Sequence, residues 1–360
     1  MKRLYLLIAF CLLLSGSAFA QLSEAPADKA YSLKAFNHLD VSFTAGTTGL
    51  GFDLAMPIGD YVQVRTGLDF MPHFKKNMDF GIQVGEDPAQ SQSKFNRLQG
   101  MLSTLTGYSV DNTITMEGHP TFWNWKLLVD VFPFKENKHW HVTAGFYLGP
   151  AHIATAENIM ADMPSLMAVG IYNNLYDKVA ASPVINDPYY FMDHTAAEVL
   201  DDISLLQALG WQSPEALQQI SLDPDNNPVK NLYDRIYNYG KMSIHMGDYV
   251  ERNADGTVRP YRMKPDANSM VSARIRVNRF KPYLGFGYGG RLIKNNDSYK
   301  VSFDCGLLFW GSTPSIVTHE GVDLAKDVEN IGGKVGRYVD VISKFKVYPV
   351  LNFRISKRIF

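Results

Sequence analysis

Long stretches of this chain alternate apolar and polar residues with a period of two. Between residues 123 and 131, Trp123 and Trp125 alternate with Asn124, Lys126 and Asp130. The same alternation runs through 62–70, 140–148, 271–277, 299–309 and 351–356. Because successive side chains of a strand point to opposite faces, each stretch predicts a strand with one apolar face and one charged or small face.

Two architectures can use such strands. A soluble sandwich would bury the apolar face, whereas a membrane barrel would turn it toward lipid. The strands span roughly 9–13 residues, which suits a tilted membrane crossing, and tryptophans and tyrosines lie near strand ends, as in interfacial girdles. Short connections at 57–60, 134–137 and 294–297 alternate with long ones at 72–118, 151–267 and 312–345. We therefore predict an all-β membrane protein, an antiparallel up-and-down transmembrane β-barrel with short periplasmic turns and long external loops.

The number of strands follows from two places where the apolar face changes parity. One lies between 39–43 and 50–56, across the glycines 46 and 49, and the other lies between Val277 and Leu284. A change of parity indicates a hairpin or a bulge. A hairpin at the first place and a bulge across 279–282 give eight strands, an even number that keeps every long loop outside. Ten strands remain possible if part of a loop adds a hairpin.

The N-terminus has the pattern of an export signal. Two positive charges in Met1-Lys2-Arg3 precede an apolar run over 4–14 and the small-residue site Ala18-Phe19-Ala20. This predicts a secretory signal peptide over 1–20, cleaved between Ala20 and Gln21. The run is well short of the ~20 residues that a spanning helix needs. Cleavage also removes one of the two cysteines, so we expect no internal disulfide in the mature chain.

The predicted organisation follows from these boundaries. A periplasmic lead-in occupies 21–37, the first part of the barrel with about five strands occupies 38–150, and the remainder of the barrel occupies 268–360. Between them, 151–267 is expected to be a mainly helical extracellular insertion. A capping box at 195–198, Ser213-Pro214 and Pro228 each signal a helix start. Further helices are expected at about 153–168 and 322–343, the second within the helical loop 312–345.

The polar faces of the strands predict a charged lumen. An eight-stranded barrel has an interior just filled by side chains, and charges there must pair or stay hydrated. Acids and bases in similar numbers favour a closed, cross-linked interior over a charged conduit. The charged residues expected inside are Asp53, Arg65, Asp69, Lys126, Asp130, Arg274, Arg276, Lys300, Asp304 and Arg354.

Signals for catalysis and cofactors are weak. The glycine-rich stretch 285–290 matches a dinucleotide fingerprint by letter, but no helix follows to hold a pyrophosphate. His139 and His141 share the inward face without a nearby third metal ligand, so hydrogen-bonded lumen histidines are favoured. A formal net charge of −1 argues against nucleic-acid binding through bulk charge. We expect no catalytic residue, cofactor, metal site or nucleic-acid partner.

The C-terminal segment, from Tyr348 to Phe360, resembles the last strand of bacterial outer-membrane barrels, which ends in phenylalanine. Arg358 stands where those strands usually carry an aromatic residue. Three internal stretches, 47–51, 282–287 and 302–307, resemble an uncharacterised Bacteroides-type barrel family that is loosely related to porin-like and OmpA-like barrels. The resemblance implies an outer-membrane location in a Gram-negative bacterium, with Phe360 as the terminal residue, and no peptidoglycan-binding domain after the barrel.

Two functions remain open at this stage. We favour a monomeric, non-enzymatic surface protein that acts in recognition or envelope integrity through its external loops, because these take about half of the mature chain. The alternative is a narrow porin or small-molecule channel gated by the insertion, which ten strands or an arginine ladder through the lumen would favour. An outer-membrane lipid enzyme ranks third. Expected partners are outer-membrane lipid, the barrel-assembly machinery and an extracellular ligand or protein bound through 151–267.

Overall fold

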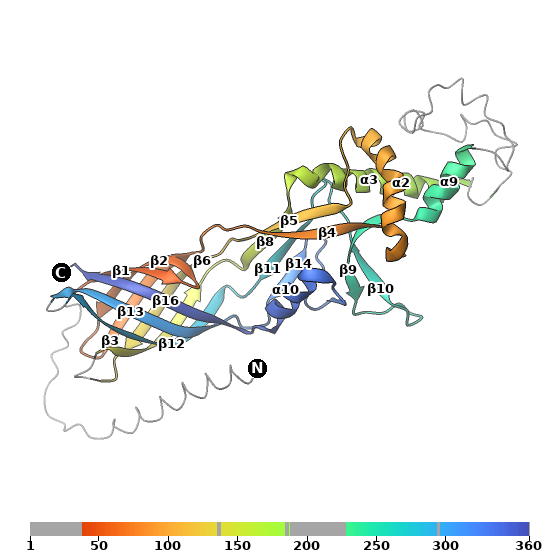
Figure 1. The fold of residues 1–360 in the computed structure, drawn as a ribbon. Helices are drawn as coiled ribbons and strands as arrows, with labels where there is room; N and C mark the ends of the chain where they lie inside the picture. The colour runs from red at the N-terminus through yellow and green to blue at the C-terminus, as the bar shows by residue number, and fades with distance from the viewer. Residues whose placement is uncertain (1–37, 135–137, 184–186, 188–227, 294–295, 360) are drawn as a thin grey trace.

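The computed structural model describes residues 38–134, 138–183, 187, 228–293 and 296–359. These residues form a closed antiparallel barrel and a second sheet beyond one of its ends (Figure 1). The strand order around the barrel is β1-β16-β13-β12-β7-β6-β3-β2, which confirms the predicted fold class and the prediction of eight strands. The barrel strands are β1 (Asp40–Gly46), β2 (Gly49–Pro57), β3 (Val62–Phe70), β6 (Trp123–Val131), β7 (Trp140–Leu148), β12 (Phe280–Ile293), β13 (Asn296–Phe309) and β16 (Val347–Arg358).

The first change of parity is a hairpin, as predicted. Gly46 pairs with Gly49, so only Thr47 and Thr48 connect β1 to β2. Gly49 has a positive φ of 100°, which glycine adopts at little cost. A side chain at this position would also collide with the carbonyl of Phe70. The hairpin places five barrel strands before residue 150.

The three long connections leave the same end of the barrel and build the second sheet together (Figure 1). They run between β3 and β6, between β7 and β12, and between β13 and β16. The order in the second sheet is β10-β9-β4-β5-β8-β11-β14, and β15 pairs with β9. The strands are β4 (Lys76–Val84), β5 (Thr113–Pro120), β8 (His152–Asn158), β9 (Met242–Tyr249), β10 (Arg259–Met263), β11 (Ser272–Arg276), β14 (Ser315–Thr318) and β15 (Val328–Glu329).

Helices pack on the second sheet, but not all where the sequence predicts them. The helix expected over 153–168 is wrong in its first half, because β8 pairs there with both β5 and β11. The helix expected over 322–343 is confined to its second half, since β15 precedes it. The helix expected from Pro228 to near Gly240 is present, and those expected after 195 and 213 lie outside the described residues. The described helices are α2 (Pro88–Thr106), η1 (Met160–Asp162), α3 (Met163–Ala181), α9 (Pro228–Tyr239) and α10 (Gly333–Lys344).

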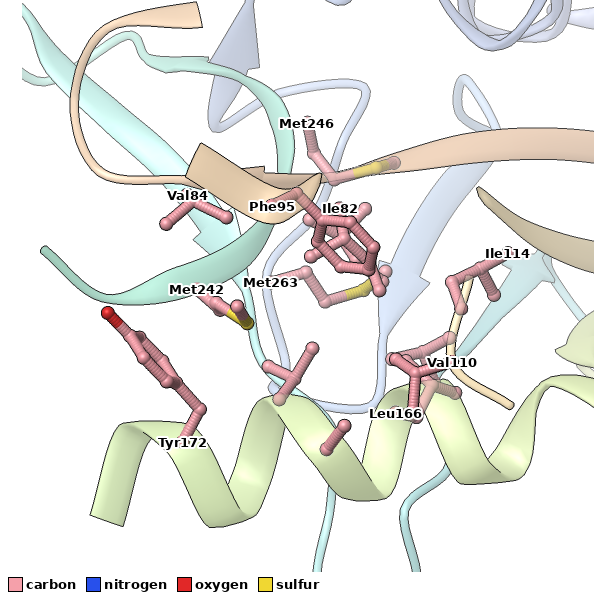
Figure 2. Packing of buried hydrophobic residues seen from close by; sticks show 14 of the residues in the cluster. Ile82, Val84, Phe95, Val110, Ile114, Leu166, Tyr172, Met242, Met246 and Met263 are labelled. Atoms are coloured by element: carbon pink, nitrogen blue, oxygen red, sulfur yellow. The ribbon is translucent and has the colours of Figure 1, made fainter. Parts of the chain in front are cut away.

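The second sheet and its helices enclose a hydrophobic core of their own. Phe95 from α2 and Leu166 and Tyr172 from α3 pack with Ile82 of β4 and Met242 of β9 (Figure 2). Local signals start and stop the α2 helix. The Asp87 side chain accepts a hydrogen bond from the Ala89 amide at 2.9 Å, and Gly107 ends the helix with a φ of 73°. The long connections are therefore a folded unit rather than separate loops.

The second change of parity, across 279–282, is not the predicted bulge. Odd residues of β11 such as Ile275 pack toward the core of the second sheet, and the odd residue Tyr283 of β12 points into the barrel. Even residues are exposed in both strands, as Arg276 and Leu284 illustrate. Even residues therefore face outward in both strands. The apolar residues are the odd ones in β11, which face the core of the second sheet, and the even ones in β12, which face outward from the barrel.

Candidate functional site

The barrel wall is apolar outside and polar inside. In β6, Trp123, Val129 and Val131 are exposed, whereas Lys126 and Asp130 are buried. A nine-residue strand tilted by about 40° rises about 23 Å, close to the ~25 Å apolar band of membrane barrels. Exposure of this apolar outer surface to water would be unfavourable, so the barrel is suited to a lipid environment. Among the described residues, no helix is long and apolar enough to cross a membrane.

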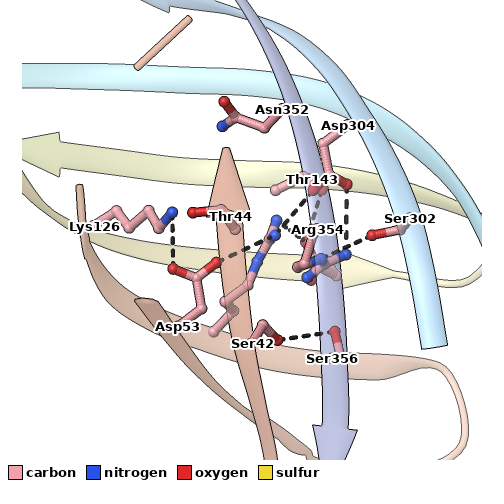
Figure 3. A network of polar contacts seen from close by, with 12 residues as sticks. Ser42, Thr44, Asp53, Lys126, Thr143, Ser302, Asp304, Asn352, Arg354 and Ser356 are labelled. Carbon is pink, nitrogen blue, oxygen red and sulfur yellow. Dashed lines mark hydrogen bonds and ion pairs between the residues drawn. The ribbon is translucent and has the colours of Figure 1, made fainter. Parts of the chain in front are cut away.

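A buried polar network fills the middle of the lumen (Figure 3). Lys126 of β6 is 1% exposed and lies between two carboxylates of neighbouring strands. Its Nζ is 2.8 Å from Asp53 Oδ1 and 2.7 Å from Asp69 Oδ1. Thr44 of β1 also donates to Asp69 Oδ1, at 3.5 Å. Strands β1, β2, β3 and β6 are thereby joined through their side chains as well as their backbones.

Arg65 is the centre of the network. Its guanidinium reaches Asp130 Oδ1 at 3.1 Å, Asp304 Oδ2 at 3.1 Å and Asp53 Oδ2 at 3.7 Å. These three carboxylates come from β6, β13 and β2. A fork of guanidinium donors can satisfy several carboxylates at once, which a lysine ammonium does less well. Arg65 therefore ties opposite walls of the barrel together.

The far side of the lumen is closed by Arg354 of β16 and His141 of β7. His141 Nε2 lies 2.7 Å from Asp304 Oδ1, and Arg354 Nη2 lies 3.5 Å from the same oxygen. Arg354 also donates from Nε to Ser302 Oγ at 2.8 Å (Figure 3). Of the two histidines predicted to face the lumen, His141 does so, whereas His139 lies exposed at the barrel end with Nδ1 2.6 Å from the Gly289 carbonyl oxygen.

Glycines of β12 make room for this network. A side chain at Gly287 would collide with His141 and with Asp304 Oδ1, and one at Gly285 would collide with the Tyr283 hydroxyl. The glycine-rich stretch 285–290 lies within β12 rather than before a helix. Its glycines therefore serve close packing in the lumen, where they leave space for His141 and Asp304.

Apolar side chains seal the lumen at the end next to the second sheet. Leu128, Tyr147, Tyr283 and Leu308 form one buried cluster there with Val350. This seal was not predicted from the sequence, because strict alternation assigns all apolar barrel residues to the outside. The available signal was the breakdown of alternation at the pairs 127–128 and 307–308, where two leucines stand side by side.

The structure brings most of the predicted lumen charges together. Lys300 lies at the opposite rim, is 39% exposed, and pairs with Asp40 at 3.2 Å. The expected lumen positions of Arg274 and Arg276 are wrong: both are exposed on β11 in the second sheet. Their polar face continues the outer surface of the barrel, not its inner surface. The signal cleavage residues Ala20 and Gln21 and the terminal Phe360 lie outside the described residues. The charges that meet in the lumen are Asp53, Arg65, Asp69, Lys126, Asp130, Asp304 and Arg354.

The arrangement of this network suits a structural role, in which paired charges hold the barrel strands together. Four buried aspartates face three buried cations, Arg65, Lys126 and Arg354, with Lys281 and His141 nearby in the lumen wall. Charges of both signs in similar numbers offset the desolvation that each would otherwise suffer. Within the described ranges, no group of three or more His, Cys, Asp or Glu residues is placed to hold a metal ion.

Comparison with known proteins identifies distant barrel structures. No protein family matches the sequence, and no curated protein does. The crystal structures of CarO2 and CarO from Acinetobacter baumannii are each 12% identical, with a TM-score of 0.34, and the matches cover 89% of this chain and 98% and 97% of theirs. A major outer membrane protein from Thermus thermophilus is 10% identical with a TM-score of 0.25, covering 89% of this chain and 98% of that one. Similarity this low carries no functional argument, and the barrel assignment rests on the strand pairing of the chain itself.

Proposed function

We propose that this chain is a non-enzymatic outer-membrane β-barrel protein that acts in surface recognition through a folded extracellular platform. The platform consists of the second sheet and the helices packed on it. The apolar outer wall supports a membrane location, and the secretory pattern of residues 1–20 supports export to the outer membrane of a Gram-negative bacterium. The end of β16 and the short turn between β2 and β3 lie at the barrel end away from the second sheet (Figure 1). This arrangement supports a periplasmic position for that end and an external position for the second sheet.

The observation that carries the proposal is the merging of three long connections into one sheet with its own core. Residues from α2, α3, β4, β9 and β14 contribute to a single buried cluster. A barrel that served only as a membrane anchor would have no need of such a structure. A platform held by six chain crossings from the barrel is fixed in orientation, which lowers the ordering cost of binding a partner.

The filled lumen favours a surface-recognition role over a channel. Arg65 and Lys126 bridge carboxylates across the barrel, and the seal around Tyr147 closes the end next to the second sheet. An ion passing through would have to displace buried, mutually paired charges. We therefore expect folded protein to conduct no ions, contrary to the porin alternative.

Planar-bilayer conductance tests this expectation. Protein whose folding is established by a heat-dependent mobility shift is inserted into a bilayer, with a general porin as the positive control. The proposal predicts a silent bilayer at insertion levels that give clear steps for the porin. Reproducible single-channel steps from the folded protein would instead support the narrow porin or small-molecule channel.

Truncation of the platform tests the recognition role. Short turns replace residues 72–121, 150–278 and 311–346, which leaves every barrel strand intact. Cells producing the truncated or the full chain are compared in adhesion, autoaggregation and detergent resistance. We expect the truncated barrel to fold and insert but to lose the surface phenotype. Full complementation by the truncated barrel would contradict the proposal.

Finer assignments rest on the sequence. The stretches 47–51, 282–287 and 302–307 support membership of the Bacteroides-type barrel family. A terminal strand that ends in Phe360 supports recognition by the barrel-assembly machinery, and a closed eight-stranded barrel supports a monomer. The external partner would bind the platform, to which the described parts of 151–267 contribute β8, α3, α9, β9 and β10.

A further inference from the structure

Three arginines form a row on the outer surface where the barrel meets the second sheet. Arg274 and Arg276 lie on β11 and Arg279 lies just before β12, and all three side chains are at least partly exposed. None of them forms an ion pair with a described residue, whereas the lumen arginines Arg65 and Arg354 each contact two or more carboxylates. The row is therefore a concentration of positive charge that no described residue neutralises through an ion pair.

The neighbouring strands place no acid directly opposite Arg274 or Arg276, and Glu157 of β8 lies opposite Ser272, two residues from Arg274. In the sheet register, Arg274 lies between Thr155 of β8 and Val317 of β14. Arg276 pairs with Ser315 of β14 and, after a register shift between Ile275 and Arg276, with His152 of β8. His152 is partly exposed and is the neighbour of Arg276 at this irregularity.

His152 supplies a second, independent observation. Its Nδ1 atom is buried and makes no hydrogen bond within the described part of the chain. The pKa of His152 lies below 6.5 because of burial and because Arg276, Arg274 and Arg279 repel a proton on the ring. Arg274 and Arg276 lie two residues apart on one face of β11, and His152 is the register partner of Arg276.

The row lies immediately above the lipid-facing surface. Arg279 directly precedes Phe280, which is 52% exposed on the outer wall and packs with Phe146. Arg276 ends β11 four residues before Phe280 begins β12, so the two residues are separated by at most about 13 Å of extended chain. The row thus begins at the level of the lipid headgroups and extends outward from it.

We propose that the row formed by Arg274, Arg276 and Arg279, together with His152, binds the phosphate groups of an anionic glycolipid in the outer leaflet. This inference rests on the proposed outer-membrane location. Guanidinium groups bind phosphate oxygens through paired, charge-assisted hydrogen bonds. A lipid headgroup fits the site because the row is continuous with the apolar wall, where the acyl chains of the same molecule would lie.

Native mass spectrometry of the full chain in detergent micelles tests the proposal. The probes are a diphosphorylated lipid A-type glycolipid, the same glycolipid without phosphates, and phosphatidylethanolamine. We expect the wild type to retain the diphosphorylated glycolipid at least tenfold better than either other lipid. Simultaneous replacement of the three arginines by glutamine should reduce retention roughly 10- to 100-fold, since each cation near the membrane surface adds up to about a fivefold preference.

A matched variant separates specific binding from bulk charge. Arg235→Gln, Arg252→Gln and Arg259→Gln together remove the same charge from exposed positions elsewhere in the platform. This control should retain the glycolipid within about twofold of the wild type, because its charges lie away from the row. A heat-dependent mobility shift should establish folding of both variants. Equal retention by the arginine-row variant, or equal retention of the phosphate-free glycolipid, would overturn the proposal. Failure of the proposed function would appear separately, as conductance or as full complementation by the truncated barrel.

Discussion

Replacement of Arg65 by methionine should destabilise the barrel strongly. Methionine retains much of the side-chain length but removes the positive charge and all five donors. In the wild type the Arg65 guanidinium lies 3.1 Å from both Asp130 and Asp304 and 3.7 Å from Asp53. The substitution leaves these buried carboxylates with excess negative charge.

The magnitude follows from the burial of the pairs. Side chains of Arg65, Asp130 and Asp53 are at most 3% exposed, so solvent cannot replace the lost partner. Breaking a buried pair by removing one member typically costs about 3–5 kcal/mol of the free energy of unfolding. Arg354 still pairs with Asp304 and Asp130, at 3.5 Å and 3.7 Å, and keeps the expected loss within that range.

Equilibrium unfolding in urea, with the protein in lipid vesicles and tryptophan fluorescence as the signal, measures this loss. Lys75→Met is the matched control, because Lys75 pairs with Glu117 at 2.8 Å but is 58% exposed. Exposed ion pairs contribute about 0–1 kcal/mol to the free energy of unfolding. Adding Asp304→Asn to Arg65→Met should recover part of the loss, because it removes one of the unbalanced charges.

A loss for Arg65→Met no larger than that for Lys75→Met would refute the reasoning. It would mean that solvent reaches the buried carboxylates and that the lumen is hydrated rather than closed by ion pairs. The porin alternative would then gain support. An absence of any recovery in the double variant would show that the loss comes from packing instead of charge.

Three further predictions use other parts of the chain. Gly287→Ala should cost roughly 1–3 kcal/mol in the same urea titration, because its methyl group collides with Asp304; a stability equal to wild type would contradict the close packing. Gly100→Ala should instead stabilise α2 by about 0.5–1 kcal/mol, since the position is helical, exposed and open, and a measurable loss would be the wrong sign. His152 should titrate below 6.5 in an NMR experiment, because burial and neighbouring arginines disfavour the charged ring. Arg276→Gln should raise that pKa toward 6.5, and stability should fall as the pH drops through 6.5, where the unfolded chain takes up the proton first; an unchanged pKa in the variant would contradict the placement of Arg276.

The barrel was predictable because its strands obey one simple rule. Alternation in stretches such as 123–131 and 351–356 assigns each residue to lipid or lumen, and Lys126, Asp130 and Arg354 are buried as that rule requires. The pairing partners within the lumen were not predictable. They depend on strand register and stagger around the barrel, which a single sequence does not specify.

The second sheet escaped prediction for a different reason. Strands such as β5 and β8 have only eight and seven residues, and their sequences lack the long alternation of the barrel strands. The prediction that Arg274 and Arg276 lie in the lumen was wrong because the alternation rule of the barrel strands was applied to β11, where the polar face points outward. A face of charged residues points inward in a membrane barrel and outward in water, so the polarity of a strand indicates its orientation only once its surroundings are known.

Site-directed spin labelling along β11 and β12 tests the central claim most directly. Single cysteines at residues 274–288, in a background without Cys305, carry labels whose collisions with oxygen and with a water-soluble nickel complex are measured in vesicles. Labels at even positions should be accessible along both β11 and β12, with Arg279 between the two strands as an exposed odd position. Nickel collisions should dominate at Arg274 and Arg276 and oxygen collisions at Leu284 and Phe286. A shift of accessibility from even to odd positions between 276 and 284, or nickel access that continues through Phe286, would contradict the central claim.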